Sequence, residues 1–267
     1  MTYKESNERI ASLEKEKKYD IDPNAGEYRF VGTQEPDHRY VYDRFIDKVY
    51  YCFLRVLVFI FAPFITFFAY RLRILGRKNL KLNNKSGAIT VSNHISFLDS
   101  LIIKQVVFKR VYFVGASHNN KKGFFGYTIK ILGFLPLSAQ FSNQKNLNRA
   151  ITQFLKKGKK VHIDPEQAMW WGYKKLRPFK NGAFNYAVTN NVPVIPIVNL
   201  IRDPNGWDKF VGRPFKVTSK VLKPVYPNDE LSPKERIIDL KNRVREEMRE
   251  EMNAFYGYEC DVERIAE

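Results

Sequence analysis

The chain of 267 residues is long enough to bury a sizeable core, and its composition, 44% hydrophobic and 27% charged, excludes a disordered or collagen-like protein. Its two cysteines, Cys52 and Cys260, are too few and too far apart for a disulfide framework or a zinc site, which favours a reducing compartment. The formal net charge is +17, and residues 101–180 combine 16 Lys or Arg with two acidic residues. Such a basic segment indicates a polyanionic partner: nucleic acid, an anionic membrane surface or a phosphorylated substrate.

Residues 1–39 are predicted to form a polar N-terminal extension. A charged, helix-like run over 4–18 leads into a connector that contains proline and glycine. No apolar segment follows a basic start, which argues against a cleavable signal peptide.

Residues 40–79 contain the most hydrophobic stretch of the chain and are predicted to form membrane-association helices. The longest run without a charge, Val56–Tyr70, would extend about 22 Å as a helix, which is less than the roughly 30 Å of a bilayer's hydrocarbon core. A longer helix would enclose Arg55 and Pro63. We therefore predict a kinked helical pair or hairpin embedded in one leaflet, with a buried core helix and a single spanning helix as alternatives.

From residue 80 to residue 267, short apolar runs alternate with helix-like segments. This order predicts an α/β domain with a mixed, largely parallel central sheet flanked by helices, in which sites gather beyond the carboxyl ends of strands. The predicted strands cover 87–92, 111–116, 160–164, 192–200 and 215–222, and the predicted helices cover 97–108, 122–132, 143–157, 181–190 and 233–254.

The stretch "VSNHISFLDS" (91–100) places His94 and Asp99 at the end of a predicted strand. The two side chains can meet if His94 lies in the turn after the strand and Asp99 in the first turn of the next helix, for which Ser96 is a candidate N-cap. A neutral imidazole oriented by a carboxylate is a suitable base for a hydroxyl group. Ser96 and Asp99 are also spaced as a capping box, so the residues alone leave a purely structural reading open.

Four ordered blocks resemble the glycerolipid acyltransferase superfamily, whose bacterial type member is 1-acyl-sn-glycerol-3-phosphate acyltransferase. "NHISFLD" resembles the family's HxxxxD signature, and "IDPEQAMWW" its "FPEGxRS" block, with matches at Pro165 and Glu166. "LGFLPLS" (132–138) resembles the strand of the second motif, and "PFKNGAFNYAV" (178–188) with "VPVIPIV" (192–198) resembles the closing blocks.

The resemblance implies a role for several residues. His94 would act as general base on an acceptor hydroxyl, which attacks an acyl thioester, and Asp99 would orient it. Pro165 and Glu166 would lie near the acceptor's polyol, and Gly182 in the turn before a helix. The donor would be acyl-CoA or acyl carrier protein, with no further cofactor and no metal.

The chain departs from the family at the positions where arginines usually bind the acceptor phosphate. Ala139 stands at the end of the second motif, and Gln167, Ala168 and Met169 replace Gly-x-Arg. Either the acceptor is not lysophosphatidate, or nearby cations bind the phosphate, for which the candidates are Lys174, Lys175, Arg177 and Lys180.

The sequence therefore predicts an O-acyltransferase of phospholipid biosynthesis that converts 1-acyl-glycerol-3-phosphate to phosphatidate. Its expected partners are a membrane lipid acceptor, the acyl donor and an anionic membrane surface, and its expected location is monotopic on the cytoplasmic face of the cell membrane. The first alternative is an acyltransferase for a non-phosphate or glycolipid acceptor. The second is a basic module that binds nucleic acid or anionic membranes, although no nucleic-acid-binding motif occurs and no nucleic-acid partner is expected.

Overall fold

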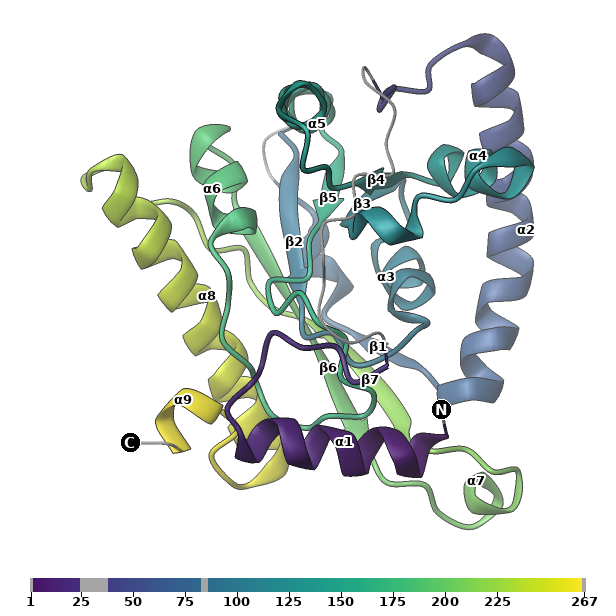
Figure 1. Cartoon of the computed structure of the whole chain (residues 1–267), viewed down its shortest axis with the longest axis vertical. Helices are drawn as coiled ribbons and strands as arrows, with labels where there is room; N and C mark the ends of the chain where they lie inside the picture. Colours follow the sequence, from purple (N-terminus) through teal and green to yellow (C-terminus); the bar gives the residue numbers. More distant parts are fainter. Residues whose placement is uncertain (1, 25–37, 83–85, 266–267) are drawn as a thin grey trace.

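The computed structural model describes residues 2–24, 38–82 and 86–265, and Figure 1 shows their arrangement around one central sheet. Among these residues, seven strands pair in the order β1-β7-β6-β2-β5-β3-β4, and every neighbouring pair is parallel except the antiparallel pair of β6 and β7. The predicted mixed, largely parallel sheet is thus confirmed. The strands are β1 (Arg73–Leu75), β2 (Ala88–Ser92), β3 (Val111–Gly115), β4 (Phe134–Pro136), β5 (Lys160–His162), β6 (Val194–Arg202) and β7 (Lys216–Val221).

The five predicted strands correspond to β2, β3, β5, β6 and β7. Strands β2 and β6, in the middle of the sheet, are almost wholly buried, which explains why they read as continuous apolar runs in the sequence. The two remaining strands, β1 and β4, have three residues each and lie at the edges of the sheet. Strand β4 lies within the 132–138 block that resembles the strand of the family's second motif, whereas no expected strand covers β1.

Helices cover both faces of the sheet. Buried residues of α5, α6 and α8 pack on one face, and those of α3 and the end of α2 on the other, as Figure 1 shows for α6 and α8 against α2 and α3. The α-helices are α1 (Tyr3–Lys15), α2 (Phe45–Tyr70), α3 (Asp99–Val107), α4 (Gly123–Ile131), α5 (Phe141–Lys156), α6 (Gly182–Thr189), α7 (Trp207–Phe210), α8 (Pro233–Tyr256) and α9 (Val262–Ile265), and two short 3-10 helices cover Arg77–Leu80 and Ser117–Asn119.

The hydrophobic segment forms one continuous helix, α2, so the predicted kinked pair or hairpin is wrong. Pro63 lies inside the helix, where its ring does not end the segment. At ~1.5 Å per residue, its 26 residues extend about 39 Å. Within the described ranges it is the one helix long and apolar enough to cross a membrane. Most of its large apolar side chains are exposed, including Phe45, Phe64 and Phe68, so α2 is not a buried core helix either.

A narrow buried stripe attaches α2 to the rest of the domain. Near its start, Asp47 accepts hydrogen bonds from Tyr127 Oη at 2.5 Å and from Arg39 at 2.9 Å. At its last residue, the Tyr70 hydroxyl accepts a hydrogen bond of 2.9 Å from Ser96 Oγ. The exposed apolar helix therefore ends in direct contact with the turn that carries His94.

The N-terminal extension packs on the domain through α1. Ile10 and Leu13 of this helix are buried against Trp170 and Tyr173, which belong to the long segment between β5 and α6. Gly172 in the same segment has a φ of +76°, and a Cβ there would lie 2.5 Å from the hydroxyl of Tyr3. Only glycine fits this close approach without a shift, so α1 and the segment after β5 are matched in shape.

Candidate active site

His94 and Asp99 meet in the turn between β2 and α3. His94 follows β2 by two residues, and Asp99 is the first residue of α3. The ring Nδ1 of His94 lies 2.7 Å from Asp99 Oδ2, so with a proton on Nδ1 it donates to the carboxylate. That hydrogen bond leaves Nε2 as the basic nitrogen of the neutral ring. The described residues provide no hydrogen-bond partner for Nε2, and the side chain is 23% exposed.

The same carboxylate also fixes the turn. Asp99 Oδ2 accepts hydrogen bonds from the backbone N–H groups of Ile95 at 2.9 Å and Ser96 at 3.0 Å. The predicted N-cap role of Ser96 is wrong: its hydroxyl accepts from the N–H of Leu98, and α3 begins at Asp99. Catalytic and structural readings of Asp99 are thus not exclusive, because one oxygen orients the imidazole and holds the turn that presents it.

Glu166 joins this turn to the segment after β5. One carboxylate oxygen accepts from the backbone N–H of His94 at 3.0 Å and from the Arg177 guanidinium at 2.7 Å, and the other accepts from the backbone N–H of Arg177 at 2.9 Å. Both side chains are at most 2% exposed. Glu166 therefore lies beside His94, and its two oxygens accept hydrogen bonds from within the protein, so the carboxylate supports the turn.

Backbone contacts add to this support. The N–H of Trp170 donates to the carbonyl of His94 at 3.1 Å, and the N–H of Gly172 donates to that of Ile95 at 2.9 Å. The amide side chain of Asn93 exchanges hydrogen bonds with the backbone of Asn199 in β6. The turn that carries His94 is thus held from α3, from β6 and from the segment after β5.

The four cations proposed to bind a phosphate are each paired with a carboxylate. Arg177 is buried against Glu166, and the three lysines form ion pairs at 2.6 to 2.8 Å. Two of the partners come from the N-terminal extension, which the sequence pattern did not place near this segment. The lysine pairs are Lys174 with Asp203, Lys175 with Glu14 and Lys180 with Asp20.

The remaining residues singled out by the resemblance lie around this segment. Pro165 is buried and its carbonyl accepts from the N–H of Lys180, whereas Gly182 is exposed as the first residue of α6. Met169 is buried, so it belongs to the core and offers no surface for a phosphate. Gln167, in the place of the family's glycine, has a φ of +63°, the left-handed conformation that glycine adopts most easily. The backbone shape of the block is thus kept without the glycine.

Nearby charges set the protonation of the site. Burial lowers the pKa of His94, but the negative charges of Asp164 and Asp99 outweigh it and raise that pKa to about 9. Burial raises the pKa of Asp99, and the hydrogen bond from His94 offsets part of that rise. The pKa of Asp164 is lowered despite its burial, chiefly by the positive charges of His94 and His162.

Asp164 was missed as a site residue by the sequence reasoning, as was its neighbour His162. His162 reads in the sequence as a satisfied strand residue, and it is buried with hydrogen-bond partners. Its position in the sequence could have identified Asp164, because it follows β5 by two residues, just as His94 follows β2 by two residues. Because β2 and β5 are parallel neighbours, their carboxyl ends lie side by side, and residues at equivalent positions after the two strands come together.

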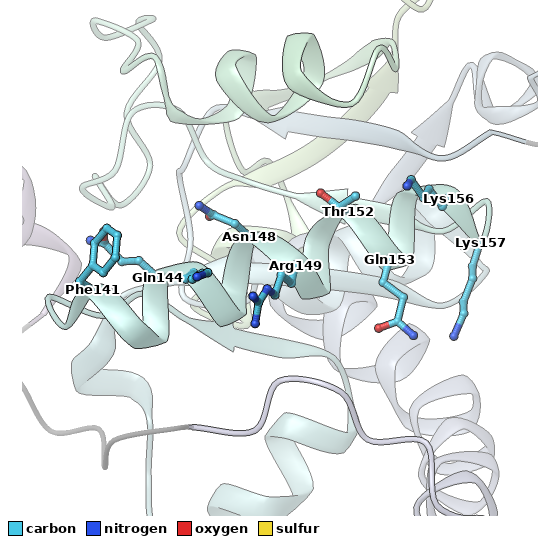
Figure 2. Close-up of a pocket in the computed structure, with 9 residues that line it drawn as sticks. Phe141, Gln144, Asn148, Arg149, Thr152, Gln153, Lys156 and Lys157 are labelled. Carbon is cyan, nitrogen blue, oxygen red and sulfur yellow. The ribbon is translucent and has the colours of Figure 1, made fainter.

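A separate groove of about 740 Å³ runs along the outer face of α5. Figure 2 shows Phe141, Arg149 and Lys157 among the side chains that line it. None of the residues discussed above as site residues takes part in its lining. The groove is therefore distinct from the site of His94.

A His–Asp pair lies in the turn after the central strand of a largely parallel sheet, joined to a Pro-Glu segment after the neighbouring strand, and this arrangement fits the HxxxxD signature. A family model described as Acyltransferase matches residues 71–199. A chloroplastic 1-acyl-sn-glycerol-3-phosphate acyltransferase, BAT2, from Brassica napus is 31% identical over 136 residues, 48% of this chain and 37% of that protein. The range that the family model matches, slightly less than half of the chain, includes His94, Asp99 and Glu166.

The solved structures agree on the fold. The crystal structure of the 1-acyl-sn-glycerophosphate acyltransferase PlsC from Thermotoga maritima matches with a TM-score of 0.50 and 22% identity, over 76% of this chain and 83% of that one. At this identity the likeness concerns the fold alone. The chain spans little more than a third of the length of the curated relative it matches, so that relative's substrate is not carried over as an observation.

Proposed function

We propose that this chain is an acyl-thioester-dependent O-acyltransferase acting on a lysophosphatidate-like lipid in phospholipid biosynthesis. The observation that carries the proposal is the His94–Asp99 pair, with Nδ1 bound to the carboxylate at 2.7 Å and Nε2 left for a substrate. The family match over residues 71–199 and the name of the Brassica napus relative support the same reaction type.

In this mechanism the bonds that form and break belong to the two substrates, the acceptor and the acyl thioester. His94 Nε2 takes the proton of the acceptor hydroxyl as its oxygen attacks the thioester carbonyl. The tetrahedral intermediate then collapses, the carbon–sulfur bond breaks, and the imidazolium returns the proton to the leaving thiolate. Asp99 stabilises the imidazolium through the bond to Nδ1, and the chain needs no further cofactor for these steps. The donor is acyl-CoA or an acyl carrier protein.

The acceptor's phosphate needs a cation other than the four that are already paired. Lys121 and Lys122 are exposed in the loop that follows β3. Because β3 is parallel to β5 and β5 is parallel to β2, this loop begins at the same end of the strands, the carboxyl end, as the turn that carries His94. We infer that these two lysines meet the phosphate as point charges, in place of the arginines that Ala139 and Met169 replace.

Replacing both Lys121 and Lys122 by alanine is expected to raise the KM for lysophosphatidate at least about tenfold, because two charge-assisted contacts are lost. The KM for monoacylglycerol, which lacks the phosphate, should not change. The matched control is the exposed pair Lys78 and Lys81, which follows β1. Because β1 runs antiparallel to β2, this pair lies at the other end of the strands from His94. Equal or better turnover of a phosphate-free or glycolipid acceptor by the unaltered enzyme would favour the alternative acceptor class.

The same proposal places the chain at a membrane, on its cytoplasmic face, with α2 as the apolar contact. The exposed aromatic side chains of α2 support this location, as does the net charge of +17, which suits an anionic surface. Because α2 extends about 39 Å, both an in-plane and a spanning orientation are compatible with its length.

The variant Phe64→Ser with Phe68→Ser is expected to weaken membrane retention, since two exposed aromatic side chains of α2 are lost. We expect the unaltered chain to stay with vesicles in high salt and the variant to be released in larger part. Ile238→Ser, on the exposed side of α8, is the control for a general loss of apolar surface. Complete release of the unaltered chain by salt alone would contradict the role of α2.

A further inference from the structure

A second carboxylate lies beside the ring of His94. Asp164 Oδ2 is 3.9 Å from Nδ1, the same nitrogen that is 2.7 Å from Asp99 Oδ2. Asp164 follows β5 and His94 follows β2, and these strands are parallel neighbours, so their turns leave the sheet side by side. In the family block quoted above, this position before Pro165 is a phenylalanine. The carboxylate is therefore a feature of this chain's own site.

Asp164 is held in place by side chains of the two strands. Its Oδ1 accepts a hydrogen bond of 2.9 Å from Ser92 Oγ and lies 3.1 Å from His162 Nε2. His162 is buried, and its Nδ1 lies 3.0 Å from Thr90 Oγ1. With a proton on Nε2, His162 donates to Asp164. Oδ1 is thus occupied, and Oδ2 is the oxygen directed toward His94.

Four charged groups face His94 from the surrounding elements. Asp99 comes from α3 and Asp164 from the turn after β5, while Glu166 and Arg177 contact its backbone N–H and carbonyl. Glu166 and Arg177 form a 2.7 Å ion pair with each other, so their charges largely cancel. His162 is the other titratable ring nearby, and it contacts Asp164. The net effect on His94 therefore comes from two carboxylates around one ring nitrogen.

We propose that Asp164 is a positioning residue that, together with Asp99, keeps a proton on His94 between turnovers and so moves acyl transfer toward alkaline pH. The inference rests on the proposed function, because it concerns the base of that reaction. A charged His94 cannot accept the proton of an acceptor hydroxyl, so kcat/KM should rise with pH as the ring loses its proton. The raised pKa of His94, about 9, agrees with this geometry.

The test is the pH profile of kcat/KM in Asp164→Asn. We expect its acid limb to move to lower pH by roughly one to three pH units, because an opposite charge close to the ring is removed. Asp164→Glu keeps the charge and should keep the limb near that of the unaltered enzyme. Asp203→Asn removes a carboxylate that pairs with Lys174, and should leave the limb unchanged.

A titration without turnover separates this proposal from the proposed function. The ring signals of His94, assigned by their loss in His94→Gln, can be followed by NMR in the folded chain. We expect a lower midpoint in Asp164→Asn, and a smaller shift in the same direction in His162→Gln, which loses the donor that orients Asp164. An unchanged midpoint in Asp164→Asn overturns the proposal. A shifted midpoint with full acyl transfer by the His94 variant overturns the base role instead.

Discussion

Replacing His94 by alanine is expected to reduce acyl transfer about 10²- to 10⁴-fold, the range over which a positioned general base contributes. The physical reason is that Nε2 is the ring nitrogen left for substrate once Nδ1 is bound to Asp99. The measurement is the rate of acyl transfer from acyl-CoA to lysophosphatidate at alkaline pH, because the pKa of His94 is raised to about 9.

Two further variants define the result for His94. Ser100→Ala, at an exposed position of the same segment, should retain full activity. Asp99→Asn should lose activity and also stability, because Oδ2 accepts from two backbone N–H groups as well as from the ring. If the alanine variant at His94 is folded and transfers acyl groups at the original rate, His94 is not the base.

Replacing Arg177 by methionine is expected to lower the free energy of unfolding by about 3–5 kcal/mol, because it leaves the buried carboxylate of Glu166 without its ion-pair partner. Arg177 also donates to the carbonyl of Ala168 at 2.6 Å, so the segment after β5 loses a second contact. Denaturant unfolding monitored by tryptophan fluorescence would report the change, since Trp170 lies under the guanidinium at 4.8 Å.

The matched control for Arg177 is Lys174→Met. Lys174 also pairs with a carboxylate at 2.7 Å, but both partners are solvent-accessible, and such a pair contributes about 0–1 kcal/mol. A similar effect of the two replacements would show that Arg177 does not support the site through Glu166. Acyl transfer should fall with stability in the Arg177 variant, because Glu166 holds the backbone of His94.

Local patterns were sufficient for most of the architecture. Buried strands such as β2 and β6 are short apolar runs, and in the helices between them apolar residues recur at helical spacing. The alternation of the two patterns along the chain predicts the α/β sheet. The pairing of His94 with Asp99 was also predictable, since five residues separate them and the turn between strand and helix brings them together. Composition alone identified the apolar segment, but it did not predict that the segment forms one continuous helix.

Which distant residues surround His94 depends on the tertiary structure. The hydrogen bond from the His94 N–H to Glu166 joins residues 72 apart, and the pair of Lys175 with Glu14 joins residues 161 apart. Local periodicity in the sequence does not predict such contacts. The relative positions of β2, β5 and α1 determine which carboxylates pair with the four candidate cations and how close Asp164 lies to His94. Pro63 likewise suggested a bend, whereas α2 is one continuous helix.

The fold class, the resemblance to the family's blocks and the His–Asp pair can therefore be read from the sequence, because each depends on residues close together in the chain. The charged groups that surround the His94 ring, in contrast, depend on the tertiary fold. The parallel pairing of β2 with β5 places Asp164 3.9 Å from its ring, and the charges that a side chain meets depend on distance in space and not on separation along the chain.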